Sequence, residues 1–184
     1  MNIKLSYSLI SWWLAGDYEG VFKALKGDWG ETSEAAQYGI DKHKEWEQEV
    51  RNTGCLPKIF GGEPLERWGT ELTRELELTD WLKLKGRVDL CHFVDGEMHL
   101  VDFKTGRTPL ATYANGIQHK IYKVLFPEAQ VFDYMQFNQH TQEVDFQRVH
   151  LSPKMYEEAV DLIITVGCDI RATLENMGEQ NGNA

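Results

Sequence analysis

The order of the predicted elements indicates an α/β fold, with a central mixed β-sheet flanked by helices and preceded by an N-terminal helical segment. Three observations support this class. Helical patterns fill residues 1–54, strand patterns occupy 70–151 around one internal helical stretch, and residues 153–177 are again helical. Helices, strands, helix, strands and helix in this order are typical of a sheet covered by helices.

Size and composition fit an ordinary globular protein. The 184 residues predict one domain spanning 1–184, and 42% hydrophobic with 26% charged residues excludes a disordered, collagenous or coiled-coil chain. No apolar run reaches the ~18 residues that a membrane helix needs. Three distant cysteines predict a reducing, cytoplasmic location and no cysteine-based zinc site; they are Cys55, Cys91 and Cys168.

The N-terminal segment predicts three helices. The first spans 8–15 with Ser8 as its N-cap, and the second spans 17–26 and is closed by Gly27. The third spans 33–52, because apolar residues recur on one face at intervals of three and four and Gly54 ends the pattern. That face comprises Ala36, Gly39, Ile40, His43, Trp46 and Val50. A loop containing Gly and Pro follows over 55–69.

The remaining patterns predict five strands and two helices. Alternating or apolar runs indicate strands, and a helical stretch stops before Pro127. The strands are expected at 72–78, 81–93, 97–104, 130–137 and 142–151, and the helices at 111–125 and 153–177. The polar residues 178–184 are expected to form a flexible tail.

One predicted hairpin places two carboxylates face to face. If Asp95 and Gly96 form a two-residue turn, Asp89 lies opposite Asp102, and Lys104 shares their face. Like charges in that position are unfavourable, and apolar neighbours on both faces indicate a central strand, where unpaired charge is costly. A hard divalent cation such as Mg²⁺ would account for the pair. Solvated surface charges are the alternative.

The same register places His92 opposite His99 on the other face of the hairpin. This pair is compatible with a metal site or with ordinary polar packing, and packing is the preferred interpretation.

Four short motifs carry a family resemblance. They are Gly86-Arg87-Val88-Asp89, Asp102-Phe103-Lys104, a helical Gly39-x-x-x-His43 and a helical Gln118-x-x-x-Tyr122. In their order along the chain, from residue 39 to residue 122, and in their spacing they resemble the PD-(D/E)-x-K nuclease superfamily, specifically its RecB-like branch. That branch includes CRISPR-associated adaptation nucleases and mitochondrial single-strand exonucleases. The resemblance implies a restriction-endonuclease-like core.

The resemblance also implies roles for individual residues. The ligands of Mg²⁺ or Mn²⁺ would be His43, Asp89, Asp102 and the main-chain carbonyl of Phe103. Lys104 would position the hydrolytic water, with Asp89 and Asp102 as its catalytic partners. Gln118 and Tyr122 would hold the lysine or the nucleic-acid backbone, and Arg107 would contact phosphate or be solvated. Either Glu75 or Glu77 would match a further acidic position. Three scattered cysteines cannot supply the four-cysteine iron–sulfur cluster of many members, so we expect none.

Charge is unevenly distributed along the chain. The net charge is −10, yet residues 81–125 hold seven basic and four acidic side chains, a balance of +3. We therefore expect a metal-dependent DNA nuclease that hydrolyses phosphodiester bonds with metal-activated water, with modest and salt-sensitive affinity. The resemblance further implies that the nuclease prefers single-stranded DNA and cleaves from a free end.

Other functions stay open at this point. One is a catalytically silent module that binds nucleic acid or protein. A sequence-specific restriction endonuclease and a metal-dependent enzyme acting on another substrate are two more. Cleavage polarity, DNA against RNA, oligomeric state and protein partners in repair, recombination or CRISPR adaptation are not determined by the sequence.

Overall fold

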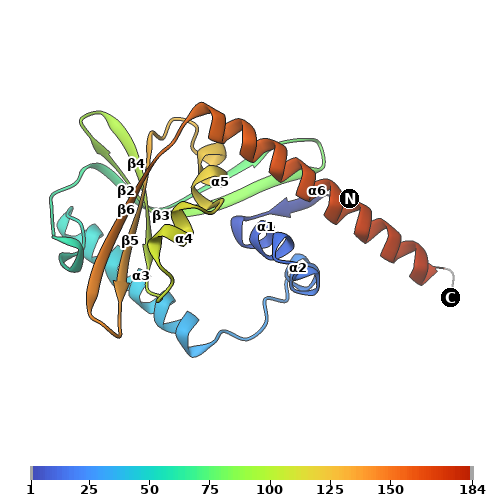
Figure 1. The fold of residues 1–184 in the computed structure, drawn as a ribbon, viewed down its shortest axis with the longest axis horizontal. Helices are drawn as coiled ribbons and strands as arrows, with labels where there is room; N and C mark the ends of the chain where they lie inside the picture. The colour runs from blue at the N-terminus through green and yellow to red at the C-terminus, as the bar shows by residue number, and fades with distance from the viewer. Residues whose placement is uncertain (1, 183–184) are drawn as a thin grey trace.

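The computed structural model describes residues 2–182, and its core is a six-stranded sheet with helices on both faces (Figure 1). The strands are β1 (Ile3–Leu5), β2 (Glu66–Glu77), β3 (Leu82–Val94), β4 (Glu97–Lys104), β5 (Val131–Asn138) and β6 (Glu143–His150). The helices are α1 (Tyr7–Leu14), α2 (Tyr18–Leu25), α3 (Glu34–Thr53), the short 3₁₀ helix η1 (Lys58–Phe60), α4 (Leu110–Ala114), α5 (Gln118–Leu125) and α6 (Pro153–Gly182).

The sheet is mixed, which confirms the predicted fold class. Its order is β1-β3-β4-β5-β6, with β2 paired to β3. The β1–β3 and β4–β5 pairs are parallel and the other pairs are antiparallel. The predicted hairpin register is confirmed over its paired length, since Val94 pairs with Glu97 and Leu90 with Val101. Asp95 and Gly96 have φ values of 51° and 87°, as a two-residue turn of this kind requires.

Strand β3 has different partners along its length, and this creates an opening in the sheet. Residues 82–84 pair with β1, whereas the ladder with β4 covers only 90–94. Helix α5 packs at the intervening segment. A Cβ added to Gly86 would lie 2.5 Å from Leu125 Cδ1, so the missing side chain permits this close approach. The opening between β3 and β4 therefore lies beside Asp89.

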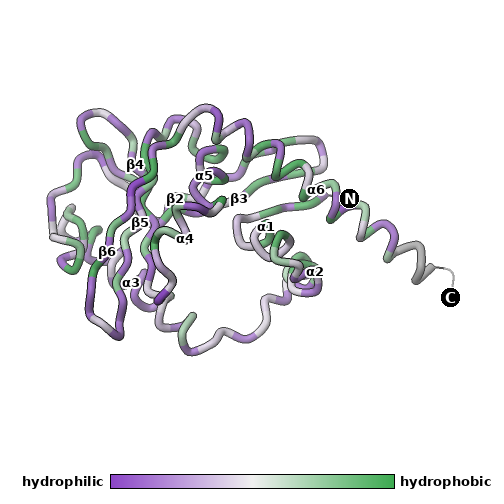
Figure 2. The backbone as a smooth tube through the Cα atoms, in the orientation of Figure 1, coloured by the Kyte–Doolittle hydropathy of each residue, from purple (hydrophilic) through white to green (hydrophobic). Residues whose placement is uncertain are grey.

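Each face of the sheet covers its own apolar cluster. The larger cluster joins β1, β3, β4 and β5 to α1, α2, α5 and α6, and includes Leu84, Leu100 and Ile163. The smaller cluster holds α3 and η1 against the opposite face through Trp46 and Phe103, among others. In Figure 2 the tube is green along much of β3 and around α1 and α2, in keeping with the larger cluster.

Several boundaries differ from the sequence prediction. The N-cap of α1 is Ser6, not Ser8, because the three residues before it form the short strand β1. The single helix expected at 111–125 is two helices, separated around Gly116, and β2 begins at Glu66 within the expected loop.

The C-terminal helix is longer than expected. It continues to Gly182, past the predicted end at 177, and its later turns extend away from the sheet in Figure 1. The remainder of the predicted tail, residues 183–184, lies outside the described residues. The assignment of 1–184 to one domain stays a prediction. Within residues 2–182, no helix is both long and apolar enough to cross a membrane.

The docking of α3 depends on Trp46, which is 3% exposed and packs edge-on against Phe60 and Phe103. We expect Trp46→Ala to lower the free energy of unfolding by about 3–5 kcal/mol, because it leaves a large cavity in a small cluster. Urea denaturation measures this. Trp29→Ala, at a residue 57% exposed, is the matched control and should cost less than about 1 kcal/mol. Equal losses in both variants would contradict this account.

Candidate active site

Asp89 and Asp102 lie at the opening where β3 and β4 separate. Asp89 directly precedes Leu90, the first residue of β3 that pairs with β4, and its Oδ2 accepts a hydrogen bond of 2.8 Å from the main-chain N–H of Phe103. This bond takes the place of a strand-to-strand bond. Its other oxygen, Oδ1, is free of that contact and faces α3. Because β3 and β4 separate here, Asp89 and Asp102 lie on adjacent strands but do not form a pair of the β-ladder.

A lysine and a glutamine enclose Asp102. Lys104 Nζ lies 2.6 Å from Asp102 Oδ2, and it donates a hydrogen bond of 3.0 Å to Gln118 Oε1. Gln118 Nε2 in turn donates to Asp102 Oδ1 at 2.7 Å. Gln118 is the first residue of α5, so the helix that fills the opening in the sheet also closes this ring of contacts. The Lys104 ammonium also lies 4.7 Å from the centre of the Tyr113 ring.

Helix α3 brings the third ligand candidate from the opposite side. His43 Nδ1 lies 3.4 Å from Asp89 Oδ1, and the imidazole ring packs near Trp46 and Phe103. A Cβ on Gly39 would lie 3.0 Å from Thr105 Oγ1, so a larger residue would push this helix away from the loop after β4. The spacing of Gly39 and His43 by one helical turn explains how both can face the site.

Burial and charge shift the titration of these groups. Burial raises the pKa of the Asp102 carboxyl, and the Lys104 ammonium opposes that rise. Burial is the largest single effect and lowers the pKa of Lys104, but the charge of Asp102 and its hydrogen bond to the ammonium, with smaller contributions from Tyr113 and Tyr7, together raise the pKa by more. His43 behaves similarly: burial lowers its pKa, and the hydrogen bond and charge of Asp89 raise it by more.

The donor set fits a hard divalent cation. Asp102 Oδ2 is buried and forms an ion pair with the Lys104 ammonium at 2.6 Å, and no further donor reaches it among the residues that the structure describes. A second carboxylate, Asp89, lies on the neighbouring strand, and two carboxylates beside one ammonium are costly unless further positive charge is present. Carboxylate oxygens with one neutral imidazole suit Mg²⁺ or Mn²⁺. The residues that could hold the ion are Asp89, Asp102, His43 and the Phe103 carbonyl.

The additional acidic residue near the site is Glu71, which the sequence reasoning missed. Its carboxylate pairs with Arg87 at 2.6 Å, and burial raises its pKa. With His43 and Glu47 it lines a cavity of about 360 Å³ beside the ligands. The candidates Glu75 and Glu77 are instead paired with Lys4 and Lys83. Glu71 has a φ of 54° near a register shift in β2, so simple strand alternation could not have identified it.

Two predicted substrate-binding residues lie further from the ring of contacts. The Tyr122 hydroxyl donates a hydrogen bond of 2.6 Å to the main-chain carbonyl of Arg87, which lies in the part of β3 not covered by β4. The Tyr122 hydroxyl therefore helps to hold β3 in place and does not contact Lys104. Arg107 is exposed on the loop after β4, where its guanidinium is accessible.

The fold and this group of side chains define a nuclease-type site: an aspartate, a D-x-K element on the neighbouring strand and a helical histidine converge at an opening in a mixed sheet. Residues 13–135, two thirds of the chain, match the PD-(D/E)XK nuclease superfamily. The chain belongs to this superfamily. No curated protein sequence matches the chain.

Solved structures share the fold at low identity. The alkaline exonuclease LHK-Exo from Laribacter hongkongensis superposes with a TM-score of 0.63 at 11% identity, covering 98% of this chain and 94% of that one. LHK-Exo in complex with dAMP gives 0.65 at 13%, with the same coverage. The structure of SSO0001 gives 0.62 at 18%, covering 89% and 74%. These likenesses extend the family match to the architecture of nearly the whole chain.

We expect Tyr122→Phe to lower the free energy of unfolding by about 1–2 kcal/mol, because the Arg87 carbonyl loses a part-buried hydrogen bond. Urea denaturation measures the loss, and Tyr156→Phe on α6, half-buried, is the matched control. A Tyr122→Phe protein of unchanged stability but weaker binding of nucleic acid would instead assign the hydroxyl to substrate binding.

Proposed function

We propose that this chain is a Mg²⁺- or Mn²⁺-dependent deoxyribonuclease of the RecB-like branch, which removes nucleotides from an end and prefers single strands. The observation that carries the proposal is the part-buried ring formed by Asp102, Lys104 and Gln118, next to Asp89 and His43. A buried ion pair is weak support for stability alone, so its retention here favours a chemical role.

The chain's own groups account for most of the proposed chemistry. Asp89, Asp102, His43 and the Phe103 carbonyl would hold the cation, which when bound lowers the pKa of water and neutralises phosphate charge. Gln118 fixes both Lys104 and Asp102, so neither must reorganise when substrate binds. Lys104 Nζ would donate a hydrogen bond to the attacking water or the phosphate oxygen and offset the negative charge that develops there.

Two further observations support DNA as the substrate. The solved structure of LHK-Exo holds dAMP, a deoxynucleotide. The residues 81–125 that surround the site carry the basic excess in an acidic chain, and the exposed Arg107 lies directly after the catalytic strand. Lys and Arg contacts to phosphate position nucleic acid without reading its sequence, as an exonuclease requires.

The decisive test uses single- and double-stranded DNA labelled at the 5′ or 3′ end, with Mg²⁺, Mn²⁺ or EDTA. We expect metal-dependent release of short products. Asp102→Asn and Lys104→Ala should each lower kcat by at least about 10²-fold, since each removes a fixed charge at the reacting phosphate. The product ladder gives the direction of cleavage.

Exposed residues of the same type provide matched controls. Asp161→Asn and Lys154→Ala on α6 should retain full activity. DNA binding without turnover under every condition would support a silent binding module instead. Cleavage at fixed sequences would favour a restriction endonuclease, and metal binding with no cleavage of DNA or RNA would point to another substrate.

Metal affinity should increase with pH. A ligating histidine must be neutral, and the charge of Asp89 raises the pKa of His43 in the metal-free protein despite the opposing effect of burial. Below that pKa a proton competes with the cation, so we expect the Kd for Mn²⁺ to rise about tenfold for each unit of falling pH. Calorimetric titration over a pH series measures this. His43→Gln should remove the slope; an unchanged slope in that variant would contradict the assignment.

A further inference from the structure

A second group of ligand-type side chains lies on the sheet face opposite Asp102. His92 is near the end of β3, His99 pairs with it from β4, and Asp133 follows on β5 through the parallel pairing of that strand. The three residues are 7%, 2% and 1% exposed. Three neighbouring strands thus each contribute one metal-ligating side chain to the same buried place.

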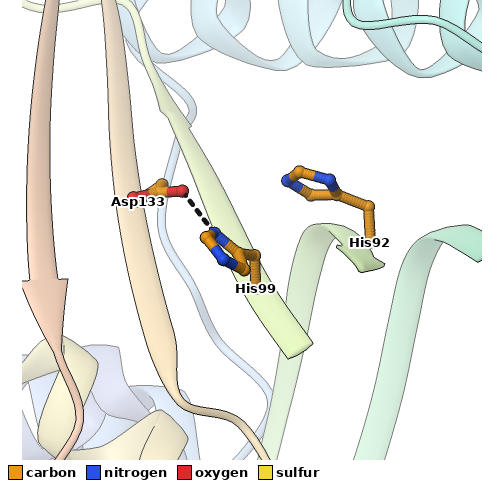
Figure 3. Close-up of side chains that lie close together, drawn as sticks. All are labelled: His92, His99 and Asp133. Atoms are coloured by element: carbon orange, nitrogen blue, oxygen red, sulfur yellow. Dashed lines mark hydrogen bonds and ion pairs between the residues drawn. The ribbon is translucent and has the colours of Figure 1, made fainter. Parts of the chain in front are cut away.

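The three side chains converge closely. One ligand atom from each lies within 4.8 Å of the other two. His99 Nδ1 lies 2.9 Å from Asp133 Oδ2, and the two imidazole rings are 5.3 Å apart. Figure 3 shows the ring of His92 extending toward His99 and Asp133, with the dashed line marking the contact between the latter two.

His92 lacks a partner in this group. Its Nε2 is buried and has no hydrogen-bond partner within residues 2–182. Burial, reinforced by His99, lowers the pKa of His92 to about 4, so its imidazole is neutral at physiological pH and carries a lone pair. A neutral, buried nitrogen aimed at a carboxylate and a second imidazole is costly unless something binds it.

Arg148 completes the surroundings of the cluster. Its guanidinium donates to Asp133 Oδ1 at 2.8 Å and Oδ2 at 3.0 Å from β6. A carboxylate has about four lone-pair sites, of which Arg148 uses two and His99 one. Arg148 reduces the net negative charge available to a cation, and it also fixes the carboxylate in the orientation that a ligand requires.

We propose that His92, His99 and Asp133 bind a divalent transition-metal ion of the Zn²⁺ class, at a site separate from the proposed catalytic centre. Two imidazole nitrogens and one carboxylate oxygen suit Zn²⁺, Co²⁺ or Ni²⁺, whereas Mg²⁺ prefers sites in which oxygen ligands predominate. The ion replaces the proton between His99 and Asp133. That proton moves to Nε2 of His99, or to solvent if the ring is charged.

His92 also lies at the edge of a cavity. It lines a space of about 270 Å³ together with Glu63 and Glu66, whose carboxylates favour the approach of a cation from that side. Once bound, the ion would link β3, β4 and β5. It would lie on the face of β4 opposite to Asp102 and Lys104. We therefore assign the ion a role in holding these strands together.

The test separates this site from the catalytic ligands. The full chain carrying Asp89→Asn and Asp102→Asn is stripped with EDTA, freed of chelator and titrated with Zn²⁺ and Co²⁺ by calorimetry and visible absorption. We expect one equivalent to bind. Changing a residue that merely orients a ligand lowers metal affinity by about 10–100-fold, and adding His92→Gln should lower it by more. His150→Gln, at an exposed histidine on β6, is the matched control.

A second measurement tests the site even if the His92→Gln variant folds poorly. X-ray absorption of the Zn²⁺-loaded protein with the two Asn substitutions should show two imidazole ligands, and Zn²⁺ at 100 times its Kd should raise Tm by about 5 °C or more. No binding in that protein, binding unaffected by His92→Gln, or a spectrum without imidazole would overturn the proposal. Mg²⁺-dependent DNA cleavage by the single His92→Gln variant tests the nuclease function independently.

Discussion

The burial of Asp102 beside Asp89 is the constraint on which the rest of the site depends. Two carboxylates on adjacent central strands would repel each other, and desolvation would add to the cost. The structure reduces this cost with Lys104 and with a glutamine that bonds to both members of the ion pair. Beyond its ion pair with Lys104, Asp102 Oδ2 receives no further donor among the side chains described. A cation bound between Asp89 and Asp102 would offset the remaining repulsion of the two carboxylates. The position that needs positive charge is therefore also the position at which a catalytic metal ion would bind.

The opening between β3 and β4 makes this arrangement possible. A continuous ladder would direct the main-chain groups of both strands into hydrogen bonds with each other and leave no role for α5. Because the ladder stops at Leu90, the Arg87 carbonyl bonds to Tyr122 and the Phe103 N–H bonds to Asp89. Gly86 allows α5 to approach, and the first residue of that helix is Gln118. The end of the β3–β4 ladder therefore determines three features together: the partners of the free main-chain groups, the close packing of α5 and the position of Gln118.

The sequence predicted what local rules determine. The Asp95-Gly96 turn fixes the hairpin register, and period-two alternation then places Asp102 and Lys104 on one face. Features that depend on contacts between distant segments could not be predicted from local sequence patterns. The strand β1 is too short for a pattern, Ile40 is 43% exposed because the first half of α3 extends past the apolar cluster, and Glu71 escapes alternation through its φ of 54°. The pair of His92 and His99 was foreseen, but Asp133 joins it only through the parallel pairing of β4 with β5.

The two faces of the same strands offer different chemistry to cations. On the face toward α5, the strands contribute oxygen atoms, and the nitrogen ligand candidate, His43, reaches Asp89 from α3 on the other side of the sheet. On the opposite face, two imidazoles belong to the strands themselves and the carboxylate is already engaged by Arg148. Since hard cations select oxygen and borderline cations select imidazole, the alternation of side chains along β3 and β4 separates the two classes of ion. A spacing of three residues, from 89 to 92 and from 99 to 102, is sufficient to place oxygen-rich and nitrogen-rich sites on opposite faces of one hairpin.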